Sequence, residues 1–397
     1  MEDKKIVQFN EKKTSRVKEL KKAERKRKFG YAYKVALGVL VVAALLTAYL
    51  IYQKTKVYES YTVSSSVARI ESEGTQTLAF KDNILSFGKD GAGAVDATGK
   101  LLWNQTFDMQ NPLISICGEM AAFADYGGST VYIQSAGGET GTVKTDMPIR
   151  KISVAEKGYV AAVLEDTDVT WIYIYDLNGT TIAYFRTTME KSGYPVDIDI
   201  SPSGELVCVS YYYVDCDDVK SSVAFFNFGD VGQNSIDNYV SGYNYTDTFV
   251  PLVRFLDDET AIAVSSGRLS VYAGAHKPLS VSDMFINDEI QSVYYDKDVI
   301  AIIYSNTSKG SKYRLEVYDI DGKVLSQKAF DFDYADLTFG NGNVILYGDK
   351  NLYIGSYEGE TKYEGNYDEP IKLVLPTVVA YRYTIVTQNT IDTVEFK

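Results

Sequence analysis

The chain of 397 residues is long enough for one large domain or two ordinary ones, and its apolar fraction of 45% allows a sizeable core. Its charge is asymmetric, because residues 1–34 hold 13 Lys or Arg and 5 Asp or Glu, whereas the rest holds 27 basic and 48 acidic residues. So acidic a domain excludes nucleic acid as its expected ligand, since phosphate binding requires a basic surface. The three cysteines are too few for a disulfide framework.

The first predicted element is a membrane-spanning helix over residues 35–53. The run Val35–Tyr52 contains 18 residues without a charge. As a helix it would rise about 27 Å, close to the roughly 30 Å hydrocarbon core of a bilayer. A cleaved signal peptide is the alternative, but 34 residues precede the apolar run and no small-residue cleavage site follows it. We therefore predict an uncleaved anchor.

Basic residues before this helix predict its orientation. Six Lys or Arg residues lie between Lys21 and Lys28, and the positive-inside rule keeps such a cluster in the cytoplasm. The same cluster could hold anionic lipid, at about 1 kcal/mol per basic residue near the surface, although fixing the topology is the simpler role. The predicted order is a basic cytoplasmic tail (1–34), the helix (35–53), a juxtamembrane linker (54–60) and an extracellular domain (61–397).

From Tyr61 onward the chain changes to short alternating segments separated by Gly, Asp and Asn, which predicts β-strands joined by turns. A strand, a tight turn and a second strand recur, most clearly at 94–103, 174–185 and 317–330. In each copy an Asp precedes the turn and a Gly follows three residues later. The Asp side chain can bond the main chain of its own turn, and the Gly can take the positive φ that the turn needs.

Two further strands precede each turn, so the unit is four antiparallel strands in about 42 residues, the period of a propeller blade. The units predict an all-β, eight-bladed β-propeller, with seven blades as the alternative. The last unit has only three strands, so we expect residues 61–71 to complete it by pairing with residues 389–397, which leaves no open edge. The innermost strands are expected near Leu78, Leu113, Ile149, Val196, Phe249, Ile290, Tyr334 and Ile371.

The copy AVDATGKLLW at 94–103 resembles the repeat of quinoprotein-like propellers, in which a motif of this type, ending in tryptophan, locks adjacent blades. The copy at 174–185 keeps the turn and has Tyr184 or Phe185 near the position of the tryptophan. The resemblance implies a propeller, commonly of eight blades, found both in quinone-dependent dehydrogenases and in lipoproteins of outer-membrane assembly. The layout of the whole chain also resembles an uncharacterised family of Gram-positive bacterial single-pass membrane proteins with an outer propeller.

Residue types that carry chemistry are sparse. The one histidine, His276, is expected in an exposed turn, so neither an ordinary zinc site nor a Ser-His-Asp triad is predicted. The quinone enzymes of the resembled superfamily use a vicinal cysteine pair, whereas Cys117, Cys208 and Cys216 are not adjacent. Cys208 and Cys216 are expected to be free thiols, with a disulfide across a hairpin between them as the alternative. We predict no catalytic residue, no cofactor and no metal. Two aspartate groups without the spacing of a known calcium loop are the alternative Ca²⁺ sites: Asp215, Asp217 and Asp218, and Asp331, Asp333 and Asp336.

The longest unit starts near Val196 and contains six tyrosines that form a candidate binding surface. Long loops on a rigid scaffold often carry function, and tyrosine gives a large contact area at low entropic cost. The alternative is that these tyrosines only fill strand positions. The residues are Tyr211, Tyr212, Tyr213, Tyr239, Tyr243 and Tyr245.

The predicted function is that of a membrane-anchored extracellular scaffold that binds a protein or a cell-envelope component, and not of an enzyme. Two alternatives stay open. One is an enzyme that acts on envelope glycan or peptide through carboxylates in the central channel. The other is a sensor that couples an outer ligand to a cytoplasmic partner through the basic tail.

Overall fold

The computed structural model describes Lys34, residues 37–45, Thr47 and residues 56–397, apart from 71–73, 168, 188–191, 216–217, 247 and 308–309. The chain divides into two units, residues 1–56 and 57–397. In the first unit the described residues from Lys34 to Thr47 are helical. Of the helices in the described residues, none combines the length and the apolar character that crossing a membrane requires. The predicted tail and much of the predicted helix over 35–53 lie outside the described residues.

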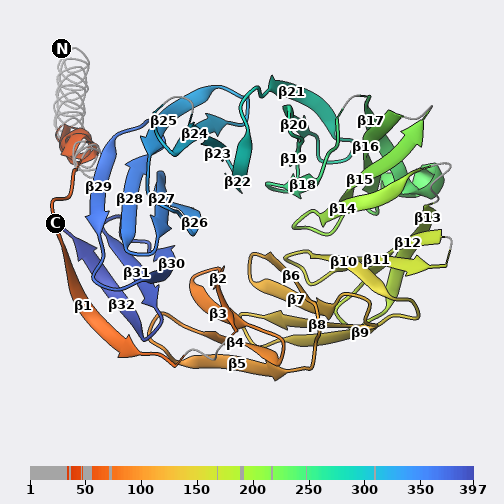
Figure 1. Cartoon of the computed structure of the whole chain (residues 1–397), viewed down its shortest axis with the longest axis horizontal. Helices are drawn as coiled ribbons and strands as arrows, with labels where there is room; N and C mark the ends of the chain where they lie inside the picture. Colours follow the sequence, from red (N-terminus) through yellow and green to blue (C-terminus); the bar gives the residue numbers. More distant parts are fainter. Residues whose placement is uncertain are drawn as a thin grey trace, which may run out of the picture. The chain divides into compact units, whose positions relative to one another are not determined.

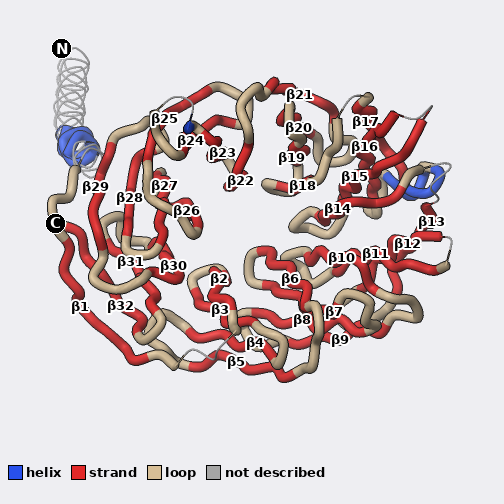
Figure 2. The backbone as a smooth tube through the Cα atoms, viewed as in Figure 1, coloured by secondary structure: helices blue, strands red, loops and turns tan. Residues whose placement is uncertain are grey.

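Residues 57–397 form a β-propeller. The described strands make eight four-stranded antiparallel sheets, which stand as blades around a ring (Figure 1). The blades consist almost entirely of strands and connecting loops (Figure 2). This arrangement confirms the predicted all-β class and the count of eight blades.

The first four blades follow one another along the chain, each with its innermost strand first. Blade 1 contains β2 (Gln76–Phe80), β3 (Asn83–Phe87), β4 (Gly91–Val95) and β5 (Leu101–Thr106). Blade 2 contains β6 (Pro112–Cys117), β7 (Met120–Asp125), β8 (Thr130–Ser135) and β9 (Thr140–Lys144). Blade 3 contains β10 (Ile149–Val154), β11 (Val160–Asp166), β12 (Val169–Tyr175) and β13 (Thr181–Thr187). Blade 4 contains β14 (Tyr194–Ile200), β15 (Leu206–Asp215), β16 (Asp218–Asn227) and β17 (Tyr239–Tyr245), with the short 3-10 helices η1 (Gly232–Asn234) and η2 (Ile236–Asn238) before β17.

The other four blades continue in the same order, and the last of them takes its outermost strand from the start of the propeller. Blade 5 contains β18 (Leu252–Phe255), β19 (Thr260–Val264), β20 (Arg268–Ala273) and β21 (Leu279–Phe285). Blade 6 contains β22 (Ile290–Asp296), β23 (Val299–Ser305), β24 (Tyr313–Asp319) and β25 (Val324–Phe330). Blade 7 contains β26 (Asp336–Gly340), β27 (Asn343–Gly348), β28 (Asn351–Ser356) and β29 (Thr361–Asn366). Blade 8 contains β30 (Ile371–Pro376), β31 (Arg382–Thr387), β32 (Thr390–Phe396) and β1 (Tyr61–Ala68).

The first and last strands close the ring. β1 pairs antiparallel with β32, from Tyr61 opposite Phe396 to Ala68 opposite Thr390. This confirms the predicted pairing of residues 61–71 with 389–397 for the described residues. The innermost strands β2, β6, β10, β14, β18, β22, β26 and β30 also lie at or near the positions that the repeat predicts.

The repeated turns form as their Asp and Gly residues predict. In the three clear copies the Asp carboxylate accepts the main-chain amides of the residues two and four positions later. The Gly of each turn has a φ of 78°, 80° or 83°. The residues are Asp96 with Gly99, Asp176 with Gly179, and Asp319 with Gly322. A Cβ on Gly179 would also lie 2.9 Å from the carbonyl oxygen of Thr142 on β9, so this turn touches the outermost strand of the preceding blade.

The core lies in the seams between blades. Trp103 on β5 packs against Phe80 of its own blade and Phe123 of blade 2, with ring centroids 6.0 Å and 6.2 Å apart. The tryptophan therefore bridges two blades, as the quinoprotein-like repeat implies. In blade 3 the strand register puts Ala183 at the position that corresponds to Trp103. Phe185, two residues further along the same face, packs into the seam with blade 4.

Candidate functional site

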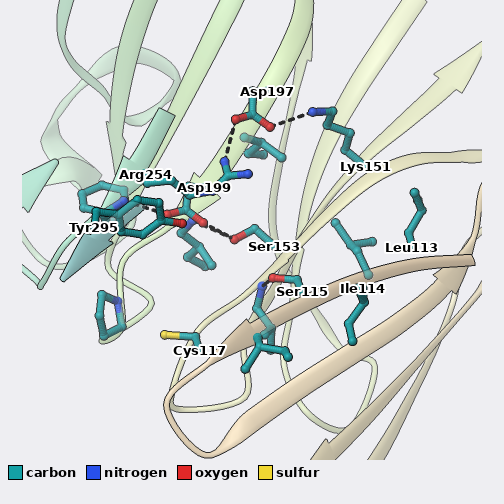
Figure 3. Close-up of a pocket in the computed structure, with 17 residues that line it drawn as sticks. Leu113, Ile114, Ser115, Cys117, Lys151, Ser153, Asp197, Asp199, Arg254 and Tyr295 are labelled. Carbon is teal, nitrogen blue, oxygen red and sulfur yellow. Dashed lines mark hydrogen bonds and ion pairs between the residues drawn. The ribbon is translucent and has the colours of Figure 1, made fainter. Parts of the chain in front are cut away.

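The inner strands of five blades line one cavity. Its volume is about 340 Å³, and its walls come from β6, β10, β14, β18 and β22. We call it the inner-strand cavity (Figure 3). Residues two apart in a strand point to the same side, so each strand can present a pair of polar residues here. The polar lining consists of Ser115, Cys117, Lys151, Ser153, Asp197, Asp199, Arg254 and Tyr295.

Asp197 links three blades through its carboxylate. The Nζ atom of Lys151 lies 2.7 Å from its Oδ1 atom, and the Nη1 atom of Arg254 lies 2.6 Å from its Oδ2 atom (Figure 3). The amide of Val253 donates to the same Oδ2 atom at 3.0 Å. The side chain of Asp197 is only 4% exposed. Both of its oxygens are therefore engaged, and the two cations are fixed on either side of it.

Asp199 borders the same cavity but is held by neutral donors. The hydroxyl of Ser153 donates to its Oδ1 atom at 2.6 Å, and the amide of Phe255 donates to its Oδ2 atom at 2.7 Å. Burial raises the pKa of Asp199, an effect that the positive charge of Arg254 opposes. This carboxyl group therefore holds its proton to a higher pH than an exposed aspartate does.

The pKa values of Arg254 and Cys117 depend on the same burial and the same neighbouring charges. Burial lowers the pKa of Arg254, but the charges of Asp197 and Asp199 raise it by more, so the guanidinium group stays charged. Burial raises the pKa of Cys117 to about 12, and the negative charges of Asp199 and Glu156 add to this. At neutral pH the thiol of Cys117 is protonated and is a weak nucleophile.

The inner-strand carboxylates were not singled out from the sequence. The signal that could have identified them is the segment YPVDIDI at 194–200, an expected innermost strand. Its two aspartates occupy alternate positions, so in a strand both point to one side. In most strands of the propeller such alternate positions are apolar or mixed, and two carboxylates there indicate a polar cavity.

The six predicted tyrosines lie on both faces of the blade 4 sheet. The register places Tyr211, Tyr213 and Tyr239 on the face toward blade 3, and Tyr212, Tyr243 and Tyr245 on the face toward blade 5. The residues of the candidate binding surface are therefore divided between two faces of the sheet. The reason is that consecutive residues of a strand point to opposite sides.

On the face toward blade 5, the tyrosines hold two blades together. Tyr245 is 4% exposed, and its hydroxyl shares a hydrogen bond with that of Tyr272. The hydroxyl of Tyr243 donates to the carbonyl of Pro278 at 3.1 Å and accepts the amide of Ser280 at 3.1 Å. These contacts give Tyr243 and Tyr245 a structural role.

On the face toward blade 3, Tyr211 and Tyr239 line a second cavity of about 370 Å³, between β13 and blade 4. We call it the rim cavity, because β13 is the outermost strand of its blade. Tyr211 is 3% exposed, whereas Tyr239 is 48% exposed. Of the six predicted tyrosines, Tyr211 and Tyr239 thus contribute one buried and one open ring to the same cavity, and Tyr243 also borders it.

The remaining sequence candidates are dispersed. His276 is exposed in the turn before β21, as predicted, and Cys117 and Cys208 are free thiols. Asp333 pairs with Lys312, whereas Asp336 accepts the hydroxyl of Tyr347 at 3.3 Å. Cys216 and Asp217 lie outside the described residues. In the part of the chain that is described, no three His, Cys, Asp or Glu side chains lie close enough to hold a metal ion.

The fold and the inner-strand cavity define a closed eight-bladed propeller with a charged, internally paired site. Residues 54–396 match a family of unknown function (DUF5711), and the chain belongs to this family. No curated protein sequence matches the chain.

Several solved structures are similar to the chain in fold. Apo AztD from Citrobacter koseri has a TM-score of 0.50 at 8% identity, over 76% of this chain and 86% of that one. BamB from Moraxella catarrhalis has a TM-score of 0.48 at 11% identity, over 85% of this chain and 100% of that one. Hsv2 from Kluyveromyces lactis has a TM-score of 0.45 at 9% identity, over 70% of this chain and 93% of that one. At these identities the likeness concerns the propeller fold alone.

Proposed function

We propose that the chain is a single-pass membrane protein whose propeller binds a protein or a cell-envelope component outside the cell. The observation that carries the proposal is the fixed arrangement in the inner-strand cavity. Lys151, Asp197 and Arg254 come from three blades and hold one another in place before a ligand arrives. Such preorganisation lowers the entropic cost of binding. A volume of about 340 Å³ suits a small ligand or a side chain of a partner.

The membrane anchor is supported by the segment that precedes the propeller. Its uncharged run of 18 residues has the length of a bilayer core. The described part of this run is helical, and Leu37, Leu40 and Leu45 are each at least half exposed, at 50%, 66% and 66%. An apolar helix surface of this kind favours lipid over water. The basic cluster before it would keep the tail in the cytoplasm. If the protein were a sensor of outer ligands, the tail would need a cytoplasmic partner.

An enzyme that uses paired carboxylates has less support from the geometry. Glycan hydrolysis needs one carboxylate free to act as a base or a nucleophile. Both oxygens of Asp197 are engaged by Lys151 and Arg254. The raised pKa of Asp199 is the one property in the cavity that would suit a general acid.

Crosslinking in cells tests the proposal. A photo-crosslinking amino acid at Leu113, which lines the inner-strand cavity, is compared with the same residue at Leu279, which is 53% exposed on β21. We expect a defined adduct from position 113, identified by mass spectrometry, that Lys151→Met weakens. Adducts from position 279 alone would move the ligand site away from the cavity. Absence of adducts at both positions would contradict a binding function.

A further inference from the structure

The rim cavity contains a row of polar side chains across blade 4. Tyr211 on β15 lies opposite Ser222 on β16, and Ser222 lies opposite Asn244 on β17. Side chains at such paired positions point to the same face of a sheet. All three residues line the rim cavity. Two hydroxyl groups and one amide thus border the same space.

An aromatic platform lies beside this row. The rings of Phe226 and Tyr239 are 6.0 Å apart at an angle of 74°, and Phe185 of blade 3 stacks on Phe226 at 4.2 Å. A Cβ on Gly242 would lie 2.3 Å from the Tyr239 hydroxyl oxygen, so the glycine makes room for that ring. Phe185 and Phe226 are buried, whereas Tyr239 stays 48% exposed and offers an open aromatic surface at the cavity.

The Tyr211 hydroxyl marks the rim cavity as a ligand site. Tyr211 is only 3% exposed, and among the described residues its hydroxyl has no hydrogen-bond partner. Burial raises its pKa, so the group keeps its proton and remains a donor. The Tyr211 hydroxyl is not one of the fully buried unpartnered atoms, so it opens onto the rim cavity that Tyr211 lines. It is therefore available to donate a hydrogen bond to a ligand there.

We propose that the rim cavity binds one sugar ring of an envelope glycan. The C–H face of a pyranose packs on an aromatic ring such as that of Tyr239, while its hydroxyls require donors and acceptors together. The hydroxyls of Tyr211 and Ser222 and the amide of Asn244 offer both. Asp237, which also lines the cavity, adds a carboxylate acceptor. The inference rests on the proposed function in one respect, namely that the ligand belongs to the cell envelope.

A peptide is the competing ligand. An aromatic or aliphatic side chain of a peptide would occupy the platform formed by Phe185, Phe226 and Tyr239. It would leave the row formed by Tyr211, Ser222 and Asn244 without partners, because such a side chain has no hydroxyl groups to offer along its edge. A sugar ring uses both halves of the cavity, so the arrangement favours the saccharide.

The test uses the full-length chain in detergent and a printed array of bacterial glycans, followed by calorimetric titration with the best-bound oligosaccharide. Tyr211→Phe removes only the unpartnered hydroxyl, so we expect affinity to fall about three- to tenfold, the equivalent of one hydrogen bond, with an unchanged unfolding midpoint. Tyr239→Ala removes the open ring and should weaken binding about tenfold or more. Tyr383→Phe is the matched control, because it removes another tyrosine hydroxyl without a hydrogen-bond partner among the described residues, on β31 of blade 8 outside the cavity, and should leave the affinity unchanged.

Several results would overturn the saccharide proposal. One is that no glycan on the array is bound, and another is that Tyr211→Phe leaves glycan affinity unchanged. Binding of a tetrapeptide rich in Phe and Trp, dependent on Tyr239 but not on Tyr211, would assign the cavity to peptides instead. None of these results would change the crosslinking expected from position 113 in the inner-strand cavity. The saccharide proposal can therefore fail while the proposed binding function still holds, and the two failures are distinguishable.

Discussion

Ser66 on β1 donates a hydrogen bond to the carboxylate of Asp392 on β32, although 326 positions separate the two residues. The hydroxyls of Tyr367 and Thr390 donate to the other oxygen of Asp392, at 2.7 Å and 3.0 Å. Asp392 is only 7% exposed. One buried carboxylate therefore joins the closing strand to blade 8 and to the residue that follows blade 7, so closure of the ring depends on side chains as well as on the main chain.

Removal of the Ser66 hydroxyl should weaken the closure. We expect Ser66→Ala to lower the free energy of unfolding by about 1–2 kcal/mol, because the hydrogen bond is to a charged group. Ser64→Ala on the same strand is the control, since that hydroxyl is exposed and donates to the carbonyl of Thr393 at 3.0 Å. Its effect should stay below about 0.5 kcal/mol. Urea unfolding followed by tryptophan fluorescence measures both, and equal losses would contradict the role of Asp392.

Neutralising Asp197 should destabilise the propeller. Asp197→Asn leaves the charges of Lys151 and Arg254 without their counter-charge, which we expect to cost about 3–5 kcal/mol. Asp230→Asn, the same change at an exposed position, should alter stability by less than about 0.5 kcal/mol. The measurement is again urea unfolding. A loss at Asp197 no larger than at Asp230 would show that the ion pairs do not hold the three blades together.

The raised pKa of Asp199 predicts a specific pH dependence. The folded protein binds this proton at higher pH than the unfolded chain, so the stability from Asp199 is fully present below the usual aspartate pKa of about 3.9 and is lost as the pH rises through the raised pKa. Asp199→Asn cannot undergo this loss. From about pH 4 to pH 7, the difference in free energy of unfolding should therefore move in favour of the variant.

This comparison isolates Asp199 because the surrounding charged and titrating groups are the same in both proteins. They are Lys151, Asp197, Arg254, Tyr295 and Cys117. A stability difference that stays constant over the same pH range would contradict the assignment. Chemical denaturation at several pH values, with an identical buffer ionic strength, provides the measurement.

The thiols of the half-buried Cys117 and the buried Cys208 should resist alkylation. Burial raises the pKa of both Cys117 and Cys208, and the thiolate is the reactive form. In a Cys216→Ser variant, maleimide at about pH 7.5 should label the native protein slowly and the urea-unfolded protein quickly, as counted by mass spectrometry. Rapid labelling of Cys208 in the native variant would show that the seam between blades 4 and 5 opens readily.

Protease accessibility checks the topology. Protease added to intact cells or protoplasts should degrade the region after Lys56 and spare residues 1–34, because we expect the basic cluster to keep the tail inside. Permeabilised cells provide the control, since there the tail should be cleaved too. Protection of the propeller in intact cells would contradict an extracellular domain.

The sequence allowed the blade count and the closure to be predicted because each turn leaves a local mark. Asp176 and Gly179 specify their turn from within a few residues, and the same pattern returns in other blades. The ion pairs of Asp197 with Lys151 and Arg254 have no local sequence pattern of this kind. Lys151 and Arg254 are 46 and 57 positions from Asp197, and only the ring decides which inner strands face one another.

The tyrosine cluster shows the limit of reasoning from composition. Tyr211, Tyr212 and Tyr213 are consecutive within β15, and alternation alone places the middle one on the other face. Whether a ring on either face is buried depends on the neighbouring blade. Tyr211 is covered by blade 3, whereas Tyr239, at the start of the outermost strand β17, stays open.

The contact between a turn and the strand of the preceding blade has a consequence for the order of assembly. A Cβ on Gly99 in blade 1 would lie 2.8 Å from a Val67 side-chain carbon on β1, the outermost strand of blade 8. Blade 1 therefore contacts a strand whose own partner, β32, is the last of the propeller strands in chain order. Until β32 is made, β1 has an unpaired edge, and the strand that blade 1 packs against is not yet part of a folded sheet. A propeller synthesised from its first strand onward therefore has to keep that edge from pairing with other strands until β32 is made.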